Sequence, residues 1–241
     1  MTTDQRMHNC LQCGQAGNGN FCSNCGYGYQ VKRLTIKSTL HEAFHLFTHF
    51  DKGFLGTLKM MVIAPGTMEK DYVEGKRSSY QKPFSMYFIC ATVCALFVYW
   101  QNIILVKYFH SEVNAETTFF HSYWVLMQVC LLPVFALITY FVFYKSKYNY
   151  AEIGVLQLYS FAFLYLMLIL IHLLKFGWPD LQTRYIEVPV VVIYGTITNL
   201  NFFTGSSKWL VILKSLFITG LCFFVAASTQ DLLVKMFQKI I

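Results

Sequence analysis

Apolar residues gather in five long stretches, which follow a polar opening of about 80 residues. The stretches cover residues 84–106, 123–144, 153–174, 188–203 and 209–227. The first three reach the roughly 20 residues that a helix needs to cross the hydrocarbon core of a bilayer. The fourth is shorter and contains Pro189, and the fifth carries Lys214 near its start. These last two are either two true spans or a re-entrant pair.

This pattern predicts an all-α integral membrane protein with four or five transmembrane helices. We divide the chain into a zinc ribbon at 1–32, juxtamembrane amphipathic helices at 33–82, a transmembrane domain at 83–228 and an amphipathic tail at 229–241. The tail suits an interfacial helix on either side of the membrane, so the number of spans and the side of the C-terminus stay open.

The composition strengthens the membrane assignment. Hydrophobic residues make up 56% of the chain and charged residues 13%, whereas about 25% of an ordinary soluble domain is charged. So little polar surface disfavours a soluble globular enzyme, and the high apolar content excludes a disordered or collagen-like chain. Just over half of the charges precede Pro83.

The distribution of cations predicts the orientation. The opening region is rich in Lys and Arg, and its first twenty residues lack the apolar core of a signal peptide. By the positive-inside rule we expect the N-terminus to be cytoplasmic, with Lys145 and Lys147 in a second cytoplasmic loop.

Four cysteines near the N-terminus carry the most specific local pattern. Cys10 and Cys13 form one CxxC pair, and Cys22 and Cys25 form a second pair after a spacer of eight residues. Two such pairs, each followed by a glycine, suit a tetrahedral zinc ion. Two disulfides are disfavoured in a reducing cytoplasm, and a doubled pair is unlike a redox CxxC. We therefore predict a minimal zinc ribbon with one structural zinc per chain.

The ribbon has little of its own core, so its metal would supply most of its folding energy. Its exposed tips could bind a protein partner, a second copy or another part of the same chain. Its low positive charge disfavours nucleic acid.

A second candidate metal site lies between the ribbon and the first span. His41, Glu42 and His45 match HExxH, in which two imidazoles one helical turn apart share a zinc and the glutamate acts as general base. Nothing in the sequence names the third ligand. The alternatives are a chance match on an amphipathic helix or a pH-sensitive contact with the spans.

Residues 35–82 predict short amphipathic helices on the membrane surface. Breaks are expected at Gly53 and at Pro65-Gly66, followed by a helix from Thr67 to Glu74 that Gly75 closes. Four cations close to the first span would attract anionic headgroups or simply anchor the chain by the positive-inside rule: Lys70, Lys76, Arg77 and Lys82.

The order of these motifs resembles a group of bacterial membrane proteins known only as a domain of unknown function. The resemblance covers roughly residues 10–90, and the later spans match only in hydropathy. It implies a bacterial inner-membrane setting and a genuine zinc ribbon, without an activity to transfer. The matching strings are Cys-Ser-Asn-Cys-Gly, His-Glu-Ala-Phe-His with the following His-x-Asp-Lys-Gly, and Tyr-Val-Glu-Gly-Lys-Arg up to Pro-Phe.

The spans contain little chemistry of their own. Glutamine and asparagine side chains within them are expected to join helices by hydrogen bonds. We therefore predict a multi-pass inner-membrane protein whose cytoplasmic ribbon is an interaction or assembly module, with lipid-headgroup contact by the protein as an additional role. The alternatives are a membrane-associated zinc hydrolase centred on His41, Glu42 and His45, and a small oligomeric transporter or channel.

Overall fold

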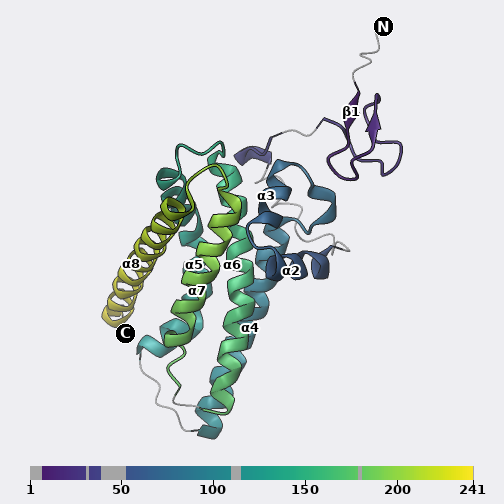
Figure 1. Ribbon diagram of the computed structural model, residues 1–241. Helices are drawn as coiled ribbons and strands as arrows, with labels where there is room; N and C mark the ends of the chain where they lie inside the picture. Colours follow the sequence, from purple (N-terminus) through teal and green to yellow (C-terminus); the bar gives the residue numbers. More distant parts are fainter. Residues whose placement is uncertain (1–6, 31–32, 39–52, 110–114, 179–180, 241) are drawn as a thin grey trace.

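The computed structural model describes residues 7–30, 33–38, 53–109, 115–178 and 181–240 (Figure 1). A small two-stranded unit precedes a helical region. The strands are β1 (His8–Asn9) and β2 (Ala16–Gly17). The helical elements that follow are α2 (Phe54–Ile63), α3 (Thr67–Glu74), the 3-10 turn η1 (Arg77–Ser79), α4 (Pro83–Phe109), α5 (Ala115–Val142), α6 (Tyr150–Leu173), the 3-10 turn η2 (Leu174–Phe176), α7 (Arg184–Phe202) and α8 (Lys208–Ile240).

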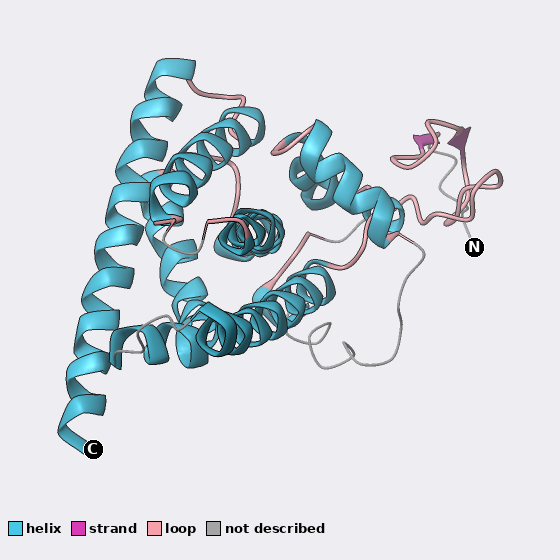
Figure 2. Cartoon of the chain, turned by 90° about the horizontal axis from the view of Figure 1, so that it is seen from below, coloured by secondary structure: helices cyan, strands magenta, loops and turns pink. Residues whose placement is uncertain are grey.

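Helix α6 is the centre of the helical region. It contacts α2, α3, α4, α5 and α7, whereas α8 packs on α5 and α7. Its sequence is apolar on all sides, as expected for a helix with neighbours all around it. Figure 2 shows α8 along one edge of the bundle, ending at the C-terminus, with the two strands lying apart from the helices.

Three helical segments in the described part of the chain are long and apolar enough to cross a membrane. They are Arg77–Tyr108, Tyr150–Phe176 and Lys208–Met236, and they contain the predicted stretches 84–106, 153–174 and 209–227. The apolar segment of α5, Leu126–Val142, is shorter. The stretch 188–203 corresponds to α7, which has 19 residues.

Helix α8 continues beyond the predicted end of the fifth stretch. Residues 228–240, which cover most of the amphipathic tail, extend the same helix without a break. Neither glycine nor proline occurs between Ala227 and the C-terminus, so nothing in the sequence ends the helix there.

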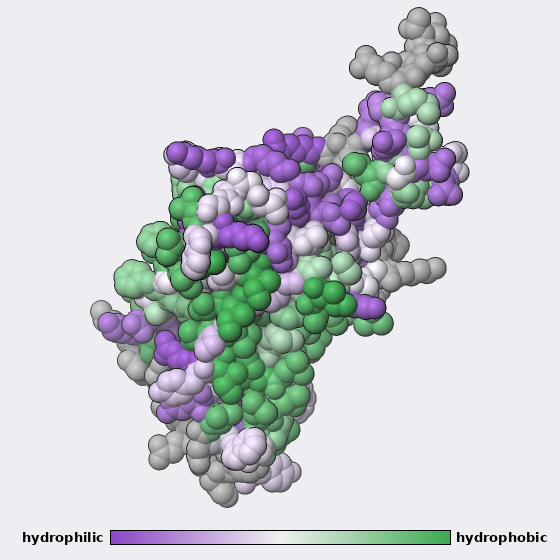
Figure 3. Space-filling view, in the orientation of Figure 1, coloured by the Kyte–Doolittle hydropathy of each residue, from purple (hydrophilic) through white to green (hydrophobic). Residues whose placement is uncertain are grey.

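Large hydrophobic side chains cover the outside of the bundle. Trp100 on α4 and Phe224 on α8 are 60% and 69% exposed. In Figure 3 the hydrophobic surface covers the bundle on the side away from the ribbon, and hydrophilic residues gather around the ribbon. A surface of this kind is suited to lipid rather than to water.

The expected breaks before the first span are confirmed. Helix α2 follows Gly53, and α3 runs from Thr67 to Glu74 before Gly75, which has a φ of 124°. Only glycine adopts this backbone region at little cost. Helix α2 lies across the direction of the bundle helices (Figure 1) and exposes Leu55 and Val62.

The turn between α2 and α3 packs directly on the end of α7. Gly66 has a φ of 80°, and its backbone N–H donates to Glu69 Oε2 at 2.6 Å. Asn201 Nδ2 donates to the carbonyl oxygen of Pro65 at 2.8 Å. The turn therefore fits only if residue 66 has no side chain.

Polar side chains join the helices, as predicted. Asn199 Nδ2 donates to Ser215 Oγ at 3.1 Å between α7 and α8, and Gln157 Nε2 donates to Thr139 Oγ1 at 2.8 Å between α6 and α5. Such bonds satisfy groups that would otherwise be unpaired in hydrocarbon.

We expect Gly66→Ala to destabilise the protein strongly. An added Cβ would lie 2.1 Å from the Thr198 carbonyl oxygen, and the left-handed backbone adds about 1–2 kcal/mol. Gly154→Ala is the matched control, because a Cβ there meets nothing within 4 Å and alanine favours the helix by about 0.5–1 kcal/mol. Thermal unfolding of the purified protein in detergent measures both, and equal midpoints would contradict this packing.

Candidate metal centre

The four N-terminal cysteines converge on one point. The sulfur atoms of Cys10, Cys13, Cys22 and Cys25 all lie within 4.8 Å of one another, so the cluster could hold a metal ion. Cys10 and Cys22 are buried, and the other two are exposed. The structure thus brings together all four residues that the spacing predicted.

Two nearly identical turns place these sulfurs. The backbone N–H of Gly14 donates to the Cys10 carbonyl oxygen, and that of Gly26 donates to the Cys22 carbonyl oxygen, each at 2.8 Å. The two glycines have φ values of 78° and 72°, which explains why a glycine follows each CxxC pair. The antiparallel pair β1–β2 holds the first turn, with His8 opposite Gly17.

The electrostatics of the cluster favour a bound cation. Backbone N–H groups, chiefly that of Cys25, lower the pKa of Cys22 to about 6. At Cys25 a hydrogen bond from the Tyr27 backbone favours the thiolate, but desolvation and the neighbouring thiols raise the pKa of Cys25 to about 12. Four thiolates repel one another, and a divalent cation between them would remove that repulsion.

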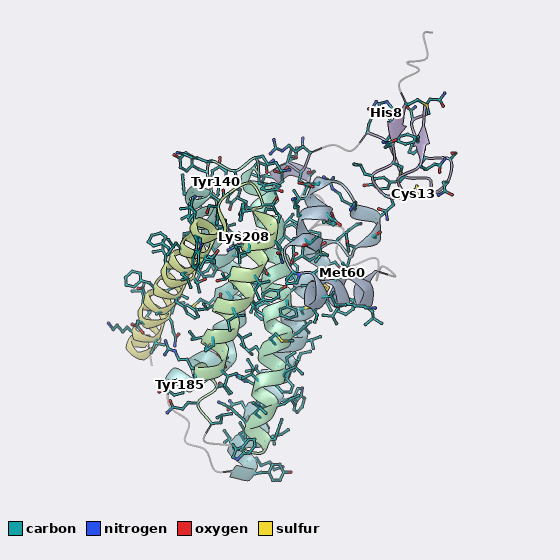
Figure 4. The ribbon with its side chains drawn as sticks, in the orientation of Figure 1. His8, Cys13, Met60, Tyr140, Tyr185 and Lys208 are labelled. Carbon is teal, nitrogen blue, oxygen red and sulfur yellow. The ribbon has the colours of Figure 1, made fainter. Side chains whose placement is uncertain are left out.

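The ribbon, defined as residues 7–30, is attached to the segment before the first span. Gln12 donates from its side-chain amide to Ser79 Oγ, and the Tyr27 hydroxyl donates to the Gly75 carbonyl oxygen. Figure 4 shows Cys13 on the ribbon, on the same side as Met60 of α2 and far from Tyr185 at the other end of the bundle. The cysteine cluster therefore lies at one end of the bundle.

A second attachment joins the linker after the ribbon to the start of α6. The Arg33 guanidinium donates to both carboxylate oxygens of Glu152, at 2.7 and 2.9 Å. Glu152 is buried and also accepts from the Asn149 backbone N–H at 2.8 Å. Nearby, Lys147 Nζ lies 2.6 Å from Glu74 Oε1. The ribbon, α3 and α6 are therefore linked through side chains.

Sequence reasoning did not assign the structural role of two buried acids, Glu152 and Glu69. Each is the third residue after the N-cap of its helix. Glu152 completes a capping box with Asn149, and Glu69 accepts a hydrogen bond from the backbone N–H of Gly66, which has no side chain to return one. The pattern Asn-x-x-Glu before an apolar run is a known start of a helix and could have located Glu152.

The four predicted headgroup cations do not converge. Lys70 Nζ donates to Thr204 Oγ1 at 2.9 Å, Lys76 pairs with Asp71 at 3.1 Å, and Arg77 Nε donates to the Tyr72 carbonyl oxygen at 3.4 Å. Lys82 is exposed. They are spread over α3, η1 and the start of α4, so headgroup contact stays a prediction.

The HExxH residues His41, Glu42 and His45 lie in 39–52, outside the described residues. A second zinc there and the hydrolase hypothesis remain predictions.

One segment of the chain is similar to a known protein family. Residues 51–94 match a family described as a protein of unknown function, DUF3667. The match covers α2, α3, η1 and the first part of α4, and it includes Gly75 and Ser79, which the ribbon contacts. No curated protein and no solved structure matches the chain. The similarity to a domain of unknown function is thus confirmed for this segment.

A buried acid lies within the matched segment. Glu69 has no exposed surface, and one of its carboxylate oxygens has no hydrogen-bond partner among the described residues. Burial raises the pKa of Glu69 from 4.5 to about 7, although hydrogen bonds from its own backbone and from Gly66 act in the opposite direction.

We predict that this acid makes stability depend on pH. Between pH 4.5 and 7 the folded protein keeps a proton on Glu69 that the unfolded chain releases, so the free energy of unfolding falls as the pH rises through this window. The full loss is about 3 kcal/mol, and Glu69→Gln should abolish it. Thermal unfolding from pH 5 to 8 measures the slope.

Glu74→Gln on the same helix is the control. Burial raises the pKa of Glu74, but the hydrogen bonds from Lys147 and Tyr148 outweigh it and leave the pKa lowered. Removing this carboxylate should therefore leave the decline toward pH 7 in place. A decline that persists unchanged in Glu69→Gln would refute the assignment.

We predict one metal ion per chain, lost in Cys13→Ser and retained in Cys130→Ser, because Cys130 lies on α5 away from the cluster. Elemental analysis of the purified protein measures the ratio. A second ion that is lost in His45→Ala would support the HExxH site instead of a single centre.

Proposed function

We propose that this chain is a multi-pass protein of a bacterial inner membrane, and that its N-terminal zinc ribbon is an interaction or assembly module on the cytoplasmic face. The process that it serves is not named by the sequence or by the fold.

The choice of zinc rests on the ligands and their spacing. The closest sulfur pairs are 3.5 and 3.6 Å apart, and four sulfurs at about 2.3 Å from a tetrahedral zinc would be separated by about 3.8 Å. Four thiolates are also a soft ligand set that suits zinc. Small shifts of the sulfur atoms, which separate the closest pairs and bring the others together, would therefore accommodate the ion.

Four or five spans are supported by the packing. Helices α5 and α7 each lie beside α6, and α8 contacts both. Because they lie among the three long apolar segments, α5 and α7 are expected to share the same membrane depth. With five spans, the N- and C-termini would be on opposite sides.

The orientation rests on the cations near the ribbon. Arg33, Lys70, Lys76 and Arg77 lie at the same end of the bundle as the ribbon, which by the positive-inside rule faces the cytoplasm. These cations and the apolar face of α2 would also contact the anionic lipid surface.

The single observation that carries the proposal is the exposed apolar surface of the ribbon. Phe21 is 69% exposed, and Met7 and Leu11 are also exposed, on a unit that already has two contacts with the segment before the first span. Exposed large apolar side chains on so small a unit are typical of a binding surface. A protein partner or a second copy of the chain would cover them.

We predict that benzoylphenylalanine placed at position 21 forms a photo-crosslinked adduct of defined mass in intact membranes. Cys13→Ser should abolish the adduct, because the ribbon loses its metal, whereas Cys130→Ser should leave it unchanged. Mass spectrometry of the adduct distinguishes a second copy from another protein. An adduct that forms equally well in Cys13→Ser, or none in the parent protein, would contradict an interaction role for the folded ribbon.

A further inference from the structure

A cavity of about 430 Å³ lies between α5, α6, α7 and α8. This is within the range of about 300–1,000 Å³ that is usual for small-molecule sites. Its walls are mostly aliphatic and aromatic, and include Phe161, Leu164, Leu168, Val191, Ile218 and Phe223. A largely apolar cavity of this size favours an apolar occupant over water.

One end of the cavity is cationic. Lys175 follows α6 and Arg184 begins α7, and both line the cavity. Neither forms an ion pair within the part of the chain that the structure describes. Tyr185, next to Arg184, lies at the end of the bundle away from the ribbon (Figure 4).

Glu187, the acid at this end, already has a hydrogen-bond partner. Glu187 Oε1 lies 3.0 Å from His172 Nε2, and His172 Nδ1 lies 3.2 Å from Gln101 Oε1. This network joins α4, α6 and α7. Glu187 therefore has His172 as its hydrogen-bonded partner, and Lys175 acts on it only through its charge. The two cations lining this end outnumber its one acid among the described residues, so this end can attract an external anion.

A further polar group lies near the same end. Phe135 stacks on Phe161, and Gln157 bonds Thr139, which fixes the antiparallel register of α5 and α6. In this register Gln128 of α5 lies opposite Leu168 of α6, and Leu168 is one helical turn before His172. Gln128 is 7% exposed, lines the cavity, and has a side-chain carbonyl oxygen with no hydrogen-bond partner among the described residues.

We propose that the cavity binds one anionic phospholipid from the leaflet opposite the ribbon. An acyl chain occupies the apolar walls, and the phosphate lies against Lys175 and Arg184. Gln128 lies about two turns of α6 deeper than Lys175, at the level of the lipid's glycerol backbone. Charge complementarity selects this occupant over a neutral lipid, and the site is separate from the metal centre, at the other end of the bundle.

Gly195 offers a way to fill the cavity. It lies on α7 and lines the cavity, and a Cβ there would meet nothing within 4 Å. Gly195→Leu should therefore place its side chain in the cavity and reduce the space left for a ligand. Gly220→Leu is the matched control, because Gly220 is equally open but lies on α8 outside the cavity lining.

Native mass spectrometry of the full-length protein in detergent, titrated with phosphatidylglycerol or phosphatidylcholine, tests the proposal. We expect one phosphatidylglycerol per chain in the parent protein and in Gly220→Leu, and at least tenfold weaker binding in Gly195→Leu. Equal binding in Gly195→Leu, or equal affinity for phosphatidylcholine, would overturn the proposal. A dimer that Gly195→Leu abolishes would show that a second copy fills the space instead.

The cationic end has its own test. Lys175→Gln and Arg184→Gln should each weaken phosphatidylglycerol binding about fivefold, as expected for one cation near a lipid phosphate. Lys107→Gln is the control, because Lys107 ends α4 but does not line the cavity. Equal losses in all three variants would exclude a specific phosphate site.

A measurement on the parent protein tests the proposal without any variant, so it does not depend on whether the variants fold. Phosphatidylglycerol with a photoreactive acyl chain, in vesicles, should crosslink to the cavity faces of α7 and α8 around Val191 and Ile218. Crosslinks spread evenly over the outer surface, for example at Trp100 and Phe224, would count against a bound lipid.

Discussion

The ion pair between Arg33 and Glu152 connects the polar opening of the chain to its membrane helices. Glu152 is buried, so its charge would be costly without the Arg33 guanidinium and the Asn149 backbone N–H that it accepts from. The same carboxylate completes the cap of α6, and α6 contacts five other helices. The start of α6, the central helix of the bundle, therefore determines where the linker contacts the bundle.

Charged pairs lie at the two ends of the described bundle, and the bonds that join its helices between the ends are neutral, as in Gln157–Thr139. At the ribbon end, Glu74 accepts from Lys147 and Tyr148, and Asn201 bonds the turn before α3. At the far end, His172 joins Gln101 and Glu187 across three helices. This separation follows from the bilayer, because unpaired polar groups are most costly at its centre.

Local patterns in the sequence predicted local structure well. The CxxC spacing located the four converging sulfurs, and the glycines and prolines before the first span located the ends of α2 and α3. The Arg33–Glu152 pair could not be predicted, because its partners are 119 residues apart and meet only through helix packing. The length of α8 is harder to predict for a different reason: the polar residues after Ala227 indicate the end of a span, although neither glycine nor proline follows to end the helix.

The two attachments of the ribbon depend on its fold to different degrees. Gln12 and Tyr27 lie in or beside the two cysteine turns, so their contacts with Ser79 and Gly75 require a folded ribbon. Arg33 lies after the ribbon, and its partner Glu152 is held by α6. Unfolding of the ribbon would therefore release it from Gly75 and Ser79 while the linker stays attached to the bundle through Arg33.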